Sequence, residues 1–165
     1  MNKMKDEIVK FYDKCRLHFY MQVFSRFENR EATLTTVESF SMECIQALDH
    51  PTIAEFADMM KISSSNAAYR VSSLVRKGYL KRIQSNEDAR MFYLEPTAKF
   101  MKYYKINTEY LETVVRRCKA RFSEEDYNRL SEYLHIINTE LMPELNLTKF
   151  KRKTNEWSSK EYRNK

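Results

Sequence analysis

The sequence predicts a mainly α-helical chain with one short β-hairpin, and three observations favour this fold class. The 165 residues contain one glycine and three prolines, well below the roughly 7% and 5% of average proteins that turn-rich sheets need. Apolar residues recur three or four apart through most of the chain, as they do on one face of a helix. One stretch, KRIQSNEDARMFYLEP at 81–96, instead places strand-like residues around a polar turn.

A long first helix is expected over residues 4–29. Its apolar stripe is rich in aromatic side chains and comprises Ile8, Tyr12, Cys15, Phe19, Val23 and Phe27. A polar break follows, and then a helix over 37–48. The side chains expected to face inward from this second helix are Phe40, Cys44, Ile45 and Leu48.

Two short helices are expected next, separated by a tight turn. Pro51 breaks the chain, and Thr52 caps a helix that ends near Met60. Ser63 is the expected N-cap of the following helix, because its hydroxyl can accept a bond from a free amide of the first turn. This helix buries Ala67, Val71, Leu74 and Val75, and it ends at Gly78, where a left-handed residue costs least.

The hairpin pairs residues 79–84 with residues 91–94 around a turn at 85–90. Pro96 then fits the first position of a long helix that reaches about Arg121. Ser123 opens a last helix with a capping-box pattern. Its apolar residues form a heptad-like seam that requires a partner helix, namely Tyr127, Leu130, Leu134, Ile137 and Leu141.

These elements predict a mainly α-helical winged helix-turn-helix with long N- and C-terminal helices and a two-stranded wing. The expected divisions are a terminal helix at 1–36, a winged lobe at 37–95, terminal helices at 96–145 and a flexible basic tail at 146–165.

Positive charge is concentrated in two segments. Residues 61–90 contain seven Lys/Arg against two Asp/Glu, and residues 146–165 again contain seven against two, whereas the rest of the chain is mildly acidic. Two basic blocks indicate a localised footprint for a polyanion. A pair of solvated basic faces is the alternative, and the tail in particular either adds phosphate contacts or serves solubility.

The location expected from the sequence is the cytoplasm. The chain has no apolar run long enough to span a bilayer and no apolar signal core near its start. Three widely spaced cysteines match neither a disulfide framework nor a metal motif.

The second helix of a helix-turn-helix enters the major groove, where base edges can be read. Short polar side chains begin that helix here, Asn suits adenine, and Arg suits guanine. Later basic residues fit phosphates, and Arg90 at the hairpin turn suits a narrow minor groove. Asp88 is expected to pair with Arg82 or Arg90. The predicted DNA-binding residues are Ser63, Ser64, Ser65, Asn66, Tyr69, Arg70, Ser73, Arg76, Lys77, Lys81, Arg82 and Arg90.

At this point the sequence resembles the MarR family of bacterial transcription regulators. The residues that carry the resemblance are Thr52-Ile53-Ala54-Glu55-Phe56-Ala57, Ile62-Ser63, Val71 with Leu74, Lys77-Gly78-Tyr79-Leu80, Arg82 and Asp88-x-Arg90. With the flanking helices, the resemblance covers roughly residues 5–145. Ala89 departs from the family's usual Asp-Arg-Arg in the wing, and Pro96-Thr97-Ala98-Lys99-Phe100 departs from its Leu-Thr-x-x-Gly.

The resemblance implies a homodimer with intertwined terminal helices that binds a pseudo-palindromic operator on double-stranded DNA, as a repressor that a small ligand releases. The segments at 1–36 and 96–145 are then the dimerisation helices, and 37–95 is the DNA-binding lobe. Many relatives bind small aromatic anions between the dimer helices and the winged lobe. The residues that would line such a pocket are Tyr12, Phe19, Tyr20, Phe24 and Phe40. An aromatic stripe at this spacing is more often core or dimer seam.

Other readings remain open. Some members of the family sense peroxide through one cysteine in the first helix, and Cys15 lies near Tyr12 and Tyr20 here, although a cysteine on an apolar stripe is commonly inert. A protein-interaction adaptor without DNA binding is a further alternative. Cys15 and His18 lack a third metal ligand, and motifs of catalysis are missing. We therefore expect no enzyme activity, no metal and no cofactor.

Overall fold

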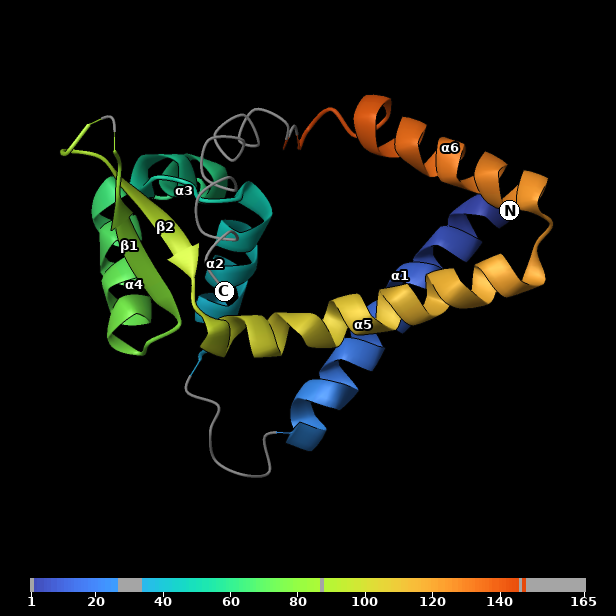
Figure 1. The fold of residues 1–165 in the computed structure, drawn as a ribbon, viewed down its shortest axis with the longest axis horizontal. Coiled ribbons are helices and arrows are strands. Elements are labelled where there is room, and N and C mark those ends of the chain that lie inside the picture. Colours follow the sequence, from blue (N-terminus) through green and yellow to red (C-terminus); the bar gives the residue numbers. More distant parts are fainter. Residues whose placement is uncertain (1, 27–33, 87, 146, 148–165) are drawn as a thin grey trace. The chain divides into compact units, whose positions relative to one another are not determined.

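The computed structural model describes residues 2–26, 34–86, 88–145 and 147, and the chain divides into two compact units. The winged unit comprises the described residues of 34–101 together with 144, 145 and 147, and the helical unit comprises residues 2–26 and 102–143. The predicted fold class is confirmed (Figure 1). The elements in order are α1 (Lys3–Arg26), α2 (Thr36–Leu48), α3 (Ile53–Met60), α4 (Ser64–Arg76), β1 (Leu80–Gln84), β2 (Phe92–Pro96), α5 (Ala98–Arg121) and α6 (Glu124–Glu140).

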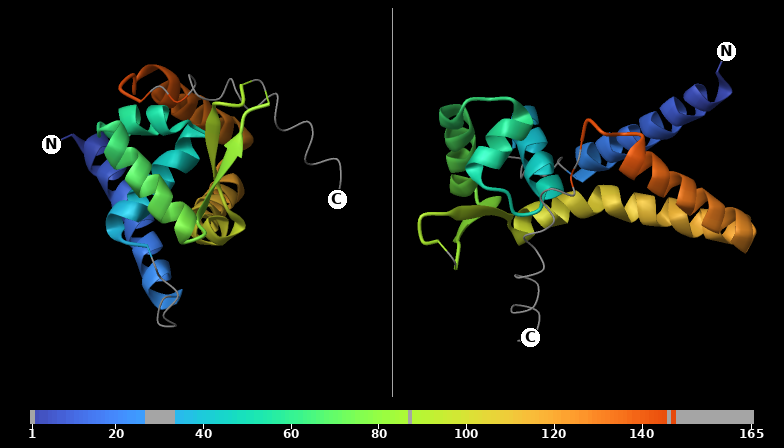
Figure 2. Two further views of the ribbon diagram at one scale, coloured as in Figure 1. Left: turned by 90° about the vertical axis from the view of Figure 1, so that its left-hand side faces the viewer. Right: turned by 90° about the horizontal axis from the view of Figure 1, so that it is seen from above.

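The core of the winged unit lies between three short helices and the hairpin. Its fully or almost fully buried side chains are Met42, Ile45, Leu48, Phe56, Ala67, Val71, Leu74, Leu80, Leu94 and Phe100. The amide of Leu94 donates to the carbonyl of Pro51 at 2.8 Å, which joins β2 to the loop after α2. Figure 2 shows the hairpin extending away from these helices. The wing is therefore attached to the helices at its base.

Side-chain caps begin the three helices of the winged unit. Thr35 with Glu38 and Thr52 with Glu55 each form a reciprocal capping box, in which hydroxyl and carboxylate accept two otherwise unpaired amides. The hydroxyl of Ser63 accepts from the amide of Asn66 at 3.3 Å. The predicted caps at Thr52 and Ser63 are confirmed.

The end of α4 is a Schellman turn built on Gly78. Its φ is 75°, its amide donates to the Val75 carbonyl at 2.9 Å, and the amide of Tyr79 donates to the Leu74 carbonyl at 3.0 Å. The strands then pair antiparallel from Leu80 with Pro96 to Gln84 with Phe92.

Four predicted details are wrong. Phe40 is 53% exposed and Cys44 is half-buried. The buried face of α2 instead combines the expected Ile45 and Leu48 with Ser41 and Met42. Val75 is 37% exposed, since Ala67, Val71 and Leu74 already cover the inward face of α4. Pro96 closes β2 instead of opening a helix, and α5 begins at Ala98.

The first residues of α5 belong to the winged unit. Phe100 is fully buried in its core, and the Lys99 ammonium donates to the carbonyl of Lys77 at 3.1 Å. The units therefore divide after residue 101, whereas we expected a boundary at 95.

The helical unit contains α1, most of α5 and α6. His18 stacks on Tyr110 with ring centroids 3.8 Å apart. The rings of Phe19 and Tyr103 pack in a T-shaped arrangement with centroids 5.3 Å apart. Ser123 caps α6 as predicted. The first helix was expected to reach residue 29, but residues 27–29 lie outside the described part. None of the described helices combines the length and apolarity needed to cross a bilayer.

Candidate nucleic-acid interface

The outer face of α4 has the composition of a surface that contacts base edges. Its first residues, Ser64, Ser65 and Asn66, are exposed, and Tyr69 is 73% exposed. Helix α4 contains no acidic residue. Short polar side chains at this end let a helix backbone approach a groove closely.

Asn66 and Arg70 form a pair on this face. They are one helical turn apart, and the Nε atom of Arg70 donates to Oδ1 of Asn66 at 3.0 Å. The bond orients the guanidinium along the helix instead of leaving it to sample many rotamers. Of the residues predicted to read bases, these two are brought together by direct contact.

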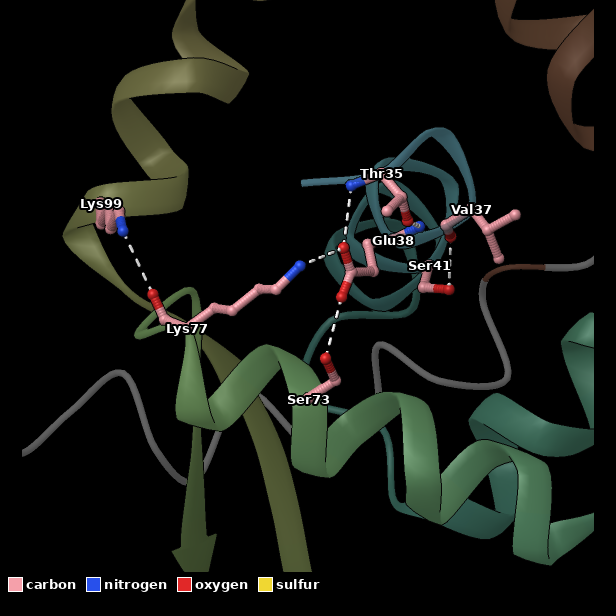
Figure 3. A network of polar contacts seen from close by, with 7 residues as sticks. All are labelled: Thr35, Val37, Glu38, Ser41, Ser73, Lys77 and Lys99. Carbon is pink, nitrogen blue, oxygen red and sulfur yellow. Dashed lines mark hydrogen bonds and ion pairs between the residues drawn. The ribbon is translucent and has the colours of Figure 1, made fainter. Parts of the chain in front are cut away.

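Two of the predicted phosphate ligands have protein partners instead. Ser73 donates to Oε1 of Glu38 at 2.9 Å, and Lys77 Nζ lies 2.7 Å from Oε2 of the same carboxylate (Figure 3). Their contact with DNA stays a prediction, and Arg76 is the exposed basic side chain near this end of α4.

Glu38 is buried, with a side chain only 12% exposed. Burial alone would raise the pKa of its carboxyl, but the hydrogen bonds from Lys77, the Thr35 amide and the Ser73 hydroxyl outweigh burial and lower the pKa to about 2. Glu38 is therefore a carboxylate that joins the start of α2 to the end of α4.

A hydrogen bond links the wing to α4. Arg82, on β1, donates through Nη2 to the hydroxyl of Ser72, on α4, at 3.2 Å. Lys81 pairs with Glu95 of the opposite strand at 2.6 Å. Arg82 and Lys81 remain exposed, so each keeps donors available to a phosphate.

Arg90 is exposed in the wing turn, as predicted from the sequence. Asp88 accepts from the backbone amide of Arg90 at 2.9 Å, and Gln84 donates through its side chain to the carbonyl of Ala89 at 2.7 Å. We expected Asp88 to pair with the side chain of Arg82 or Arg90. In the structure it stiffens the turn through the backbone, which leaves the Arg90 guanidinium at the surface.

Sequence reasoning missed Glu38, Ser72 and Glu95. The Thr35-x-x-Glu38 spacing is a capping-box signal that was available in the sequence. The partner of Ser72 depends on how the hairpin packs against α4, and the partner of Glu95 depends on the register of the two strands. No local sequence pattern predicts that packing or that register.

The aromatic residues proposed for a ligand pocket are spread over both units. Tyr12 and Tyr20 are exposed on α1, Phe19 packs near Tyr103, and Phe40 is exposed on α2. The side chain of Phe24 lies outside the described part. A pocket lined by these residues stays a prediction.

Cys15 is half-buried on α1. The neighbouring Arg16 pairs with Asp13 at 2.7 Å and lies over the ring of Tyr12 at 5.1 Å. Within the described residues, no group of three metal-ligating side chains is found.

Comparison with known proteins finds a family model that matches most of the winged unit. The sequence model of the MarR family matches residues 34–92, from the residue before the α2 cap to the start of β2. This confirms the resemblance seen in the sequence for that segment. None of the curated proteins matches the chain.

Solved structures share the fold at low sequence identity. FabT from Streptococcus pneumoniae, solved in complex with DNA, is 17% identical over 84% of this chain and 95% of that chain, with a TM-score of 0.56. The MarR-like transcriptional regulator tm0816 from Thermotoga maritima is 20% identical over 86% and 97%, with a TM-score of 0.56. A MepR mutant from a multidrug-resistant S. aureus clinical isolate is 15% identical over 86% and 99%, with a TM-score of 0.58.

Proposed function

Because residues 34–92 carry the winged helix-turn-helix of the MarR family, we propose that this protein is a sequence-specific DNA-binding transcriptional regulator. The observation that carries the proposal is the outer face of α4, polar at its start and held beside a basic wing by the bond from Arg82 to Ser72. Such a helix enters the major groove, and the wing reaches the neighbouring minor groove.

The exposed cations on α4 and the wing supply the attraction to DNA. They are Arg76, Lys81, Arg82 and Arg90. Arg76 and the base of the wing contact phosphates, which fix register, and Arg90 enters the minor groove. The basic tail at 146–165 adds further phosphate contacts.

We propose a homodimer as the DNA-binding form. Large apolar side chains are exposed on α6 (Leu130 and Leu134), at its C-cap (Leu141) and along α1, including Ile8 and Phe11. A monomer in water would leave this surface uncovered, whereas pairing with the same helices of a second copy buries it. A two-fold dimer binds two half-sites about 34 Å apart on a pseudo-palindrome.

The proposed output is repression in the cytoplasm. A dimer seated on an operator blocks access of polymerase, and a small aromatic ligand bound beside the α1 aromatics would change the separation of the two α4 helices. Because major-groove readout requires both helices at one separation, a small change of that distance releases the DNA.

The test is a titration of the protein onto the DNA upstream of its own gene, by fluorescence anisotropy at 50 and 200 mM salt, with a scrambled duplex of equal length as control. Specific binding to the upstream DNA that weakens steeply with salt supports the proposal, because bound phosphates release counterions. Equal affinity for the scrambled duplex would remove the claim of sequence specificity. Sedimentation of the free protein measures the dimer independently.

A further inference from the structure

We propose that Arg70 reads a guanine in each half-site, and that Asn66 holds Arg70 in place rather than reading adenine itself. This inference rests on the proposed function and names the base that the recognition helix selects. Its basis is the hydrogen bond from Arg70 Nε to Asn66 Oδ1 at 3.0 Å.

The bond decides which guanidinium atoms of the half-buried Arg70 are left for a base. Arginine has five N–H donors in a planar fork, and Nε is already used by Asn66. The two terminal nitrogens, Nη1 and Nη2, have no other bond among the described residues of the winged unit. They lie side by side at the end of the fork, at the spacing that two acceptors on one planar edge require.

The same bond changes what Asn66 can offer. Bidentate recognition of adenine uses the amide oxygen to accept from N6 and the amide nitrogen to donate to N7. Here the oxygen already accepts from Arg70, and the guanidinium lies beside it. The atoms that the pair has left for a base are therefore donors: the Asn66 amide nitrogen and the Arg70 fork.

A surface of donors discriminates among the four bases. In the major groove guanine shows two acceptors, O6 and N7, whereas adenine shows one acceptor and one donor. Cytosine shows a donor, and thymine shows one acceptor beside a methyl group. Guanine is the base that satisfies both terminal nitrogens of Arg70 without an unpaired donor.

Helix α4 itself does not divert the guanidinium. It contains no acidic residue, and the neighbouring exposed side chains are the hydroxyl-bearing Ser65 and Tyr69. Lys77, at the C-cap of α4, forms an ion pair with Glu38 of α2. Arg70 is thus a cation near the start of α4 that is oriented by a neutral partner.

The experiment selects high-affinity duplexes from a random-sequence library with the full-length protein and with Arg70→Ala, Asn66→Ala, the double variant and Arg76→Ala. The parent is expected to enrich a guanine at one position of each half-site. Arg70→Ala loses that preference and weakens binding to the best site by about 5- to 150-fold. Asn66→Ala weakens the preference for guanine at the same position. The double variant binds the best site as tightly, and with the same base preference, as Arg70→Ala alone. Arg76→Ala weakens all duplexes alike without altering the preferred bases.

A modified base tests which atom of the guanine Arg70 recognises. Replacing that guanine by 7-deazaguanine removes the N7 acceptor and should weaken the parent about 10-fold, but leave Arg70→Ala unchanged. If Asn66→Ala instead relaxes an A·T position and leaves the guanine intact, Asn66 reads adenine and the inference is wrong. A uniform loss of affinity in Arg70→Ala, with the same preferred bases, would make Arg70 a phosphate ligand and also overturn it. Failure of the parent to enrich any duplex would instead refute the proposed function.

Discussion

The ammonium of Lys77 lies 2.7 Å from the carboxylate of Glu38, although 39 residues separate them in the chain. Glu38 also completes the capping box of α2 and accepts from Ser73 (Figure 3). One carboxylate therefore fixes the first turn of α2 against the last turn of α4. The orientation of α4 within the winged unit depends on this ion pair as well as on apolar packing.

Glu38 should make stability depend on pH. Its pKa is about 2 in the folded protein against 4.5 for the ordinary carboxyl, so the unfolded state binds the proton first. The stabilisation is fully present well above pH 4.5 and is lost as pH falls from 4.5 toward 2. Replacing Glu38 with Gln removes this dependence. Between pH 7 and pH 3.5 the parent should lose about 1.4 kcal/mol relative to Glu38→Gln, as measured by urea unfolding. Glu132→Gln, at an exposed position on α6, serves as the control and should retain the slope of the parent.

Leu74 and Val75 are neighbours on α4 that differ in burial. Leu74 is 0% exposed and Val75 is 37% exposed. Leu74→Ala should lower the free energy of unfolding by about 2–5 kcal/mol because it leaves a cavity in the core. Val75→Ala should cost less than about 1 kcal/mol, since much of its side chain is already in water. Equal losses in chemical denaturation would mean that Val75 is buried, as the sequence suggested.

Gly78 is needed for its backbone conformation and not for space. Its φ is 75°, and a Cβ added there would meet no heavy atom within 4 Å. Gly78→Ala should therefore destabilise by about 1–2 kcal/mol through backbone strain alone. Gly78→Asn should cost less, because Asn tolerates the left-handed region. Thermal or urea unfolding of the two variants gives the comparison, and an Ala variant as stable as the parent would contradict the assignment.

Arg90 should contribute to DNA affinity through charge at the wing turn. Arg90→Ala is expected to weaken binding to the upstream DNA and to reduce the slope of log K against log salt by about 1. Arg117→Ala removes the same charge from an exposed position on α5 in the helical unit. If this control weakens binding and flattens the salt dependence as much as Arg90→Ala does, the effect belongs to net charge and not to the wing.

The sequence was most informative where a local interaction decides the structure. Thr52 and Ser63 cap helices because each hydroxyl reaches an amide three residues ahead. Gly78 ends α4 because it alone carries no Cβ into the left-handed region. The exposure of Arg90 in the hairpin turn followed from the polar residues around it in the same way.

Rotational register was harder to predict from periodicity. On α2 the aromatic ring of Phe40 suggested an inward face, but Met42 and Ser41 are the buried residues. Successive residues of a helix are 100° apart around its axis. The apolar pattern of α2 is broad enough to allow either Phe40 or Met42 to face inward, so it does not decide between the two orientations.

By itself, the sequence determined the kinds and order of the elements, the caps, the turn at Gly78 and the segment that carries the basic wing, because these depend on residues within a few positions of one another. Only the tertiary structure decided that Glu38 holds Lys77 and Ser73, that Ser72 holds Arg82, and that Glu95 holds Lys81. Such pairs join side chains from different elements, and their contact depends on how those elements pack, which no spacing along the chain encodes.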